Sequence, residues 1–108
     1  MKRILLSLLL AGAGGAALAE PAIPGQDIYE QHCAACHAPA NIMVASPKLH
    51  NRAQWAARLD AGFDVVLQNG LDGINAMPPM GACEDCTPDD IEAAIRYMAE
   101  PALTAAAN

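Results

Sequence analysis

The sequence predicts a single all-α domain of three to five helices. Apolar residues recur at helical spacing in four stretches, and no stretch alternates apolar and polar residues as a half-buried strand does. The 108 residues suffice for one domain at most. The core must be small, because only four side chains are aromatic: Tyr29, Trp55, Phe63 and Tyr97.

Residues 1–19 are expected to form a cleaved signal peptide. Two basic residues precede an uncharged, largely apolar run, and Ala17-Leu18-Ala19 matches the A-x-A pattern of a signal-peptidase site. Cleavage after Ala19 would leave residues 20–108 as the mature domain, in the periplasm. An uncleaved anchor is the alternative, but the uncharged run of 16 residues is shorter than the roughly 20 that a membrane-spanning helix needs.

The chain is acidic, with 6 basic and 12 acidic residues and a net charge of −6. Loss of Lys2 and Arg3 with the leader would leave 4 basic residues against 12 acidic ones, a net charge of −8. This balance argues against a nucleic-acid partner and favours partner proteins with basic docking patches. We expect no stable membrane insertion, and a monomer or weak dimer.

The pentapeptide Cys33-Ala34-Ala35-Cys36-His37 has the C-x-x-C-H spacing that is typical of covalent c-type haem attachment. Two thiols bind the porphyrin as thioethers, and the following imidazole reaches the iron as an axial ligand. A structural zinc pair or a thioredoxin-like dithiol is the alternative, but neither needs the trailing histidine. One covalent haem c is therefore expected, and it would form the centre of an otherwise thin core.

The first helix is predicted over residues 25–35. Tyr29, Cys33 and Cys36 fall on one face of this helix, which must look inward because it carries the haem bonds. Residues 38–49 contain two prolines and no sustained period, which indicates a loop on the proximal side of the haem.

Two short helices are predicted next. Asn51 and Gln54 form a capping box that starts the second helix, which ends before Gly62. The inner stripe of this helix is Trp55 and Leu59. The third helix contains Phe63, Val66 and Leu67 and is closed by Gly70.

The last helix has the strongest start signal in the chain. Thr87-Pro88-Asp89-Asp90 combines a hydroxyl N-cap, proline at the first helical position and acidic residues in the first turn. We expect this helix to stop before Pro101, with residues 102–108 as a frayed tail. Its inner face is made of four residues: Ile91, Ala94, Ile95 and Met98.

The second axial ligand is sought among the remaining histidines and methionines. His32 and Met43 lie too near His37 in the sequence, His50 lies in the proximal loop, and Met98 is at core spacing. That leaves Met77 and Met80, in the irregular segment of residues 71–86, where neighbouring prolines stiffen the chain. Either thioether is a candidate for the distal side of the haem.

The haem motif together with the stretch Met77–Cys86, which reads MPPMGACEDC, resembles the class I monohaem cytochromes c. The closest resemblance is to the small bacterial branch called cytochrome c-five, and it extends from Gly25 to Met98. It implies the small class I cytochrome c fold wrapped around one haem. It also implies that Met77 is the axial ligand opposite His37, with Met80 as runner-up in a position where family members commonly have lysine.

The resemblance implies further roles. The carbonyl of Pro47 should accept a hydrogen bond from Nδ1 of His37 and so fix the tautomer of the ligand. Gly25 and Tyr29 should cross the last helix near Ala94 and Tyr97. Trp55 and Arg58 are either neighbours of a haem propionate or a plain core tryptophan and a solvated arginine.

Cys83 and Cys86 are the remaining cysteines. Thr87, not histidine, follows Cys86, so a second haem is not expected. Free thiols rarely stay reduced in an exported protein, and the resemblance also implies a disulfide between this pair. This disulfide either only stabilises the loop or has a redox role, and the sequence leaves both roles open.

An iron held by histidine and methionine has both axial positions filled, which suits single-electron transfer and excludes substrate binding at the metal. The predicted function is a soluble periplasmic electron carrier, and not an enzyme, between a respiratory or dehydrogenase donor and a terminal oxidase or reductase. One alternative is a dedicated electron-transfer subunit of one periplasmic oxidoreductase. Another is a haem peroxidase-type enzyme, which would need an open iron.

Overall fold

The computed structural model describes residues 11–12, 14–15 and 23–106. The predicted cleavage site at Ala17–Ala19 lies outside these residues, as do the last two residues of the predicted tail. The described chain is helical, and its only strand-like pairing is one isolated bridge between Ile74 and Met77. Within it, no helix has both the length and the apolar character that crossing a membrane requires.

The first helical segment consists of α1 (Gln26–Ile28), a π-helical turn η1 (Tyr29–Cys33) and α2 (Ala34–His37). It extends two residues beyond the predicted end, so the whole attachment pentapeptide is helical. The prediction that Cys36 shares an inward face with Tyr29 and Cys33 is wrong, because Cys36 is exposed while the other two are buried. A π turn adds a residue to the turn and so rotates every later side chain away from its α-helical position.

Helices α3 (Arg52–Leu59) and α4 (Phe63–Asp72) follow the proximal loop, which spans residues 38–51 in the structure. Asn51 caps α3 by accepting a hydrogen bond from the backbone N–H of Gln54 at 3.0 Å. The other half of the predicted capping box is not formed, because the Gln54 side chain accepts from the backbone N–H of Lys48 instead, at 2.8 Å.

The prediction that Gly70 ends the third helix is wrong. Gly70 lies inside α4 and is buried, and a Cβ atom there would come within 2.9 Å of Cδ1 of Ile95. This glycine therefore lets α4 approach the last helix closely. The residue that follows the end of α4 is Gly73, whose φ of 84° is readily adopted by glycine.

Helix α5 (Pro88–Ala106) begins as predicted, with reciprocal hydrogen bonds between Thr87 and Asp90 of 2.9 and 3.2 Å. It runs through Pro101, so the predicted end before this proline is wrong. Proline has no N–H to offer the carbonyl of Tyr97 one turn earlier. His50 supplies the missing donor, because its Nε2 donates to the carbonyl oxygen of Tyr97 at 2.9 Å. The backbone N–H of His50 donates to the carbonyl oxygen of Met98 at 2.8 Å.

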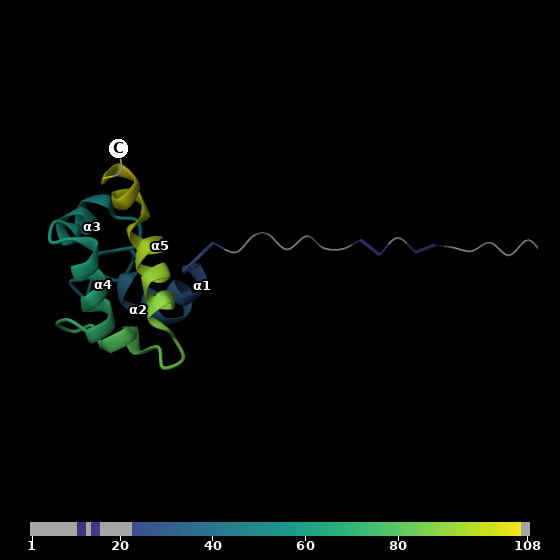
Figure 1. Ribbon diagram of the computed structural model, residues 1–108, viewed down its shortest axis with the longest axis horizontal. Helices are drawn as coiled ribbons and strands as arrows, with labels where there is room; N and C mark the ends of the chain where they lie inside the picture. The colour runs from purple at the N-terminus through teal and green to yellow at the C-terminus, as the bar shows by residue number, and fades with distance from the viewer. Residues whose placement is uncertain (1–10, 13, 16–22, 107–108) are drawn as a thin grey trace, which may run out of the picture.

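Figure 1 shows α5 running through the middle of the molecule, with α3 and α4 on one side and α1 on the other. Helix α5 contacts all of these elements and supplies most of the buried cluster. The predicted crossing with the first helix is confirmed, since a Cβ atom on Gly25 would lie 2.0 Å from the carbonyl oxygen of Ala93, and the rings of Tyr29 and Tyr97 are 5.5 Å apart. The buried face of α5 consists of six residues: Ile91, Ala94, Ile95, Met98, Ala99 and Ala102.

Candidate haem site

The two cysteines of the pentapeptide have opposite surroundings. Cys33 is 8% exposed, and its thiol donates a long hydrogen bond of 3.8 Å to the carbonyl of Ile28. Burial raises the pKa of the Cys33 thiol to about 11, which keeps it protonated at neutral pH. Cys36 is exposed. The pair therefore spans the boundary between the buried cluster and the surface.

His37 is buried, and its Nδ1 donates to the carbonyl oxygen of Pro47 at 2.7 Å, as the resemblance implied. Burial lowers the pKa of His37, the hydrogen bond to Pro47 raises it, and the nearby charge of Lys48 lowers it further. The net direction is downward, which favours the neutral imidazole that binds a metal.

The other ring nitrogen of His37 is available to a ligand. Nδ1 makes the hydrogen bond of this ring, so Nε2 carries the lone pair of the neutral tautomer. Within the described residues no buried side-chain nitrogen or oxygen lacks a partner, so Nε2 is not sealed inside the protein. A fixed and accessible imidazole beside two thiols fits the donor set that a covalent haem requires.

Trp55 supports His37 from the side of α3. Its ring lies nearly parallel to that of His37, with 18° between the planes and 6.1 Å between the centroids. The indole N–H donates to the carbonyl of Lys48 at 2.9 Å, and the side chain is 3% exposed. Because its N–H is already hydrogen-bonded, Trp55 fits the role of a plain core residue better than that of a propionate neighbour. Arg58, on the same helix, is exposed.

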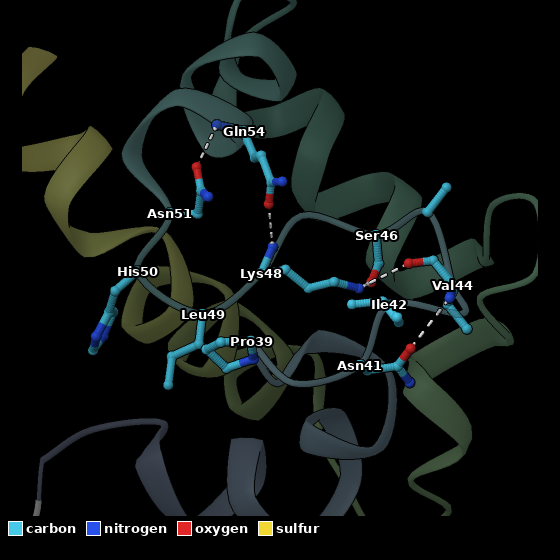
Figure 2. A pocket seen from close by; sticks show the side chains of 11 residues that line it. Pro39, Asn41, Ile42, Val44, Ser46, Lys48, Leu49, His50, Asn51 and Gln54 are labelled. Atoms are coloured by element: carbon cyan, nitrogen blue, oxygen red, sulfur yellow. Dashed lines mark hydrogen bonds between the residues drawn. The ribbon is translucent and has the colours of Figure 1, made fainter.

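The proximal loop lines a pocket of about 580 Å³. Figure 2 shows Lys48 reaching back across this loop toward Ser46 and Val44, while Asn51 and Gln54 hold its far end. His50 also belongs to this loop and joins it to α5. The sequence alone assigns His50 no role. A proline within an otherwise helical pattern, Pro101, is the signal that the carbonyl one turn earlier needs another donor.

The distal loop, residues 73–86, holds Met77 by its backbone. Ile74 and Met77 exchange two hydrogen bonds, of 3.0 and 2.9 Å. Gly73 permits this tight turn, because a Cβ atom there would lie 2.8 Å from both the Met77 oxygen and the Pro79 nitrogen.

The two candidate methionines differ in packing. Both are half-buried, but Met80 packs against the central cluster, and Met77 is not among the described residues that do so. Met80 also has a φ of 58°, within the short 3₁₀ helix η2 (Pro79–Ala82). A thioether that is already part of the core is less free to bind a metal, so the packing favours Met77.

Cys83 and Cys86 form a disulfide with a Cα–Cα distance of 5.4 Å. The ligand atoms of His32 and of both cysteines lie within 4.8 Å of one another. This cluster is not a second haem motif, because Thr87 follows Cys86 and His32 comes from a different segment. The disulfide also occupies both sulfur atoms.

Comparison with known proteins gives a consistent answer. Residues 20–98 match the family described as cytochrome c oxidase, cbb3-type, subunit III. Cytochrome c5 of Ectopseudomonas mendocina is 40% identical over 90 residues, which are 82% of this chain and 95% of that protein. The chain belongs to the class I monohaem cytochromes c, in the c5 branch.

Other relatives agree with this assignment. Cytochrome c5 of Azotobacter vinelandii is 42% identical to this cytochrome over 76 residues, covering 68% of this chain and 89% of that one. A chain from the crystal structure of an electron transfer complex of nitrite reductase with cytochrome c is 35% identical with a TM-score of 0.63, covering 72% of this chain and 93% of its own. The family carries one covalent haem c, and its members are electron carriers rather than enzymes. The predicted class I fold and the haem c cofactor are thereby confirmed.

Proposed function

We propose that this cytochrome is a soluble periplasmic single-electron carrier. In this proposal Cys33 and Cys36 bind the haem as thioethers, and His37 and Met77 are the axial ligands of its iron. The observation that carries the proposal is the state of His37, whose Nδ1 is held by Pro47 while Nε2 stays free beside both thiols. The sequence contains a single C-x-x-C-H pentapeptide, so one haem has one place to attach.

When bound, the haem supplies reversible exchange of one electron. The residues of the chain act by holding its surroundings constant. His37 is fixed in one tautomer by the Pro47 carbonyl and in one orientation by the parallel ring of Trp55. Met77, on its paired turn, would fill the remaining axial position and exclude small molecules from it. Thioether ligation favours the reduced metal, so a relatively high potential is expected.

The proposed docking face lies where the attachment helix and the two loops meet the surface. Exposed apolar side chains are present in both loops, with Ile42 and Met43 exposed by 88% and 89% and Ile74 by 44%. Small apolar patches suit the weak, fast complexes of electron transfer. The acidic chain would steer toward basic partner surfaces. Because one similar cytochrome was solved in a complex with nitrite reductase, a terminal reductase is a fitting acceptor.

The second candidate function is a dedicated electron-transfer subunit of one periplasmic oxidoreductase. The matching family is described as an oxidase subunit, which favours this reading. Purification of the exported protein from its native host separates the two. A stable complex of fixed stoichiometry with one enzyme would support the subunit, and recovery as a free small protein would support the carrier.

The proposal is tested by expressing the full chain with haem-maturation machinery. The expected product has lost residues 1–19, has an intact mass raised by one haem, and keeps its pigment after denaturation and acid extraction with organic solvent. Its ferrous form is expected to bind little carbon monoxide at neutral pH. A mass equal to the bare polypeptide would overturn haem attachment, and strong carbon monoxide binding would overturn Met77 ligation and favour an enzyme with an open iron.

A further inference from the structure

The side-chain nitrogen of Lys48 is fully hydrogen-bonded within the protein, although the residue lies near the surface. Its Nζ donates three hydrogen bonds, to the carbonyls of Cys36 (3.0 Å) and Val44 (2.8 Å) and to Oγ of Ser46 (2.8 Å). An ammonium group has three donors, so all of them are used. The side chain is half-buried and lies across its own loop, as Figure 2 shows. Its positive charge therefore has a fixed position.

This position lies beside the proposed iron ligand. The Cys36 carbonyl immediately precedes His37, and Pro47, the residue before Lys48, accepts the hydrogen bond from His37. The backbone of Lys48 is bound as well, since its N–H donates to Gln54 and its carbonyl accepts from Trp55. Lys48 thus joins the attachment pentapeptide, the proximal loop and α3.

We propose that Lys48 has two roles toward the haem. It is a positioning residue that holds the Pro47 carbonyl against His37, and its fixed charge raises the reduction potential. The ferric centre carries one more positive charge than the ferrous centre, so a cation held nearby disfavours oxidation. Half-burial makes this charge less screened than one in open solvent. The inference deepens the proposed function and rests on His37 being an axial ligand.

The two roles can be separated by substitution. Lys48→Met removes both the charge and the three hydrogen bonds. Lys48→Arg keeps the charge but places it on a larger planar group, whose donor geometry differs from that of the ammonium. Ser46→Ala removes one acceptor of Lys48 and the bond of 2.6 Å from Ser46 to the Cys36 carbonyl, without changing charge. Arg52→Met is the matched control for charge, because Arg52 is exposed at the start of α3.

The experiment measures the ratio of reduced to oxidised protein at one fixed ambient potential, together with hydrogen exchange of the proximal-loop amides. We expect Lys48→Met to lower this ratio by about three- to tenfold, where tenfold equals 59 mV for one electron. Lys48→Arg and Ser46→Ala are expected to stay within about twofold of the wild-type ratio, while their loop amides exchange faster. Arg52→Met is expected to change neither quantity.

An unchanged ratio in Lys48→Met would overturn the charge role, and so would an equal shift in Arg52→Met. Unchanged exchange in both Lys48→Arg and Ser46→Ala would overturn the positioning role. If Lys48→Met fails to mature, Lys48→Arg provides the test of the charge role. A tenfold lower ratio in this variant, which keeps the charge, would contradict that role. A wild-type protein without covalent haem or without sulfur ligation would instead defeat the proposed function itself, and the inference with it.

Discussion

The two loops that flank the candidate haem site are held by different means. The proximal loop, residues 38–51, is bound by side chains, among them the ammonium of Lys48, the amide of Asn51 and the imidazole of His50. In the distal segment, residues 73–86, no side chain makes a hydrogen bond to any described residue. That segment is shaped by its backbone pairing, its prolines and glycines, and the disulfide.

The difference matches what each loop must provide. The proximal loop delivers one carbonyl oxygen to His37, and a hydrogen bond tolerates only a few tenths of an ångström of error. The distal loop delivers a thioether, which reaches its target through a flexible side chain and needs mainly a restricted backbone. In the proximal loop, polar side chains hold the acceptor oxygen in a precise position. In the distal loop, which has few side-chain hydrogen bonds, the disulfide and the prolines and glycines restrict the backbone instead.

Replacing Met77 should produce the largest effect in the distal loop. Met77→Ala should abolish the long-wavelength ferric absorption band associated with sulfur ligation and lower the reduced-to-oxidised ratio at fixed potential by at least about hundredfold. Spectroscopy and an electrode titration measure the two quantities. Met80→Ala is the control, which should keep the band and lose about 1–2 kcal/mol of the free energy of unfolding because Met80 packs against the core. Loss of the band in Met80→Ala alone would reverse the assignment.

Removing the disulfide should weaken the distal loop without affecting the potential. The double variant Cys83→Ala/Cys86→Ala should lose about 2 kcal/mol of the free energy of unfolding, because a short closed loop limits the unfolded chain only modestly. Denaturant titration of the oxidised haem protein measures this loss. The matched control is wild-type protein whose disulfide has been reduced, whose two thiols have been alkylated and whose iron has then been reoxidised. A shift in the reduced-to-oxidised ratio of more than about threefold would show that the disulfide does more than staple the loop.

Replacing His50 should give the smallest effect, in the proximal loop. His50→Ala leaves the Tyr97 carbonyl without its donor and should cost about 1 kcal/mol of the free energy of unfolding. In a Pro101→Ala background the restored N–H can bond to that carbonyl, so His50→Ala should cost clearly less there. A double-mutant cycle of thermal or denaturant unfolding measures the coupling. Equal costs in the two backgrounds would contradict the role assigned to His50.

The sequence predicted most of what depends on local chemistry. The N-caps at Asn51 and Thr87 are both present in the structure. The close approach of Gly25 to α5, which the family resemblance implied, is present as well. The hydrogen bond from His37 to Pro47, which also came from the resemblance, is present too. The errors at the two helix ends concern features that depend on distant neighbours. The sequence predicts helix ends at Gly70 and before Pro101, but Ile95 packs against Gly70, and His50 donates to the carbonyl that Pro101 leaves without a donor.

The amino-acid sequence by itself determined the attachment pentapeptide, the strong helix starts and the pair of candidate methionines, because each depends on residues a few positions apart. Tertiary structure alone decided that Lys48 has three acceptors, that Met80 and not Met77 packs into the core, and that α5 continues through its proline. The physical reason is the same in each case. The role of a charge, a thioether or an unpaired carbonyl depends on the group that it contacts, and the conformation of the folded chain decides which group that is.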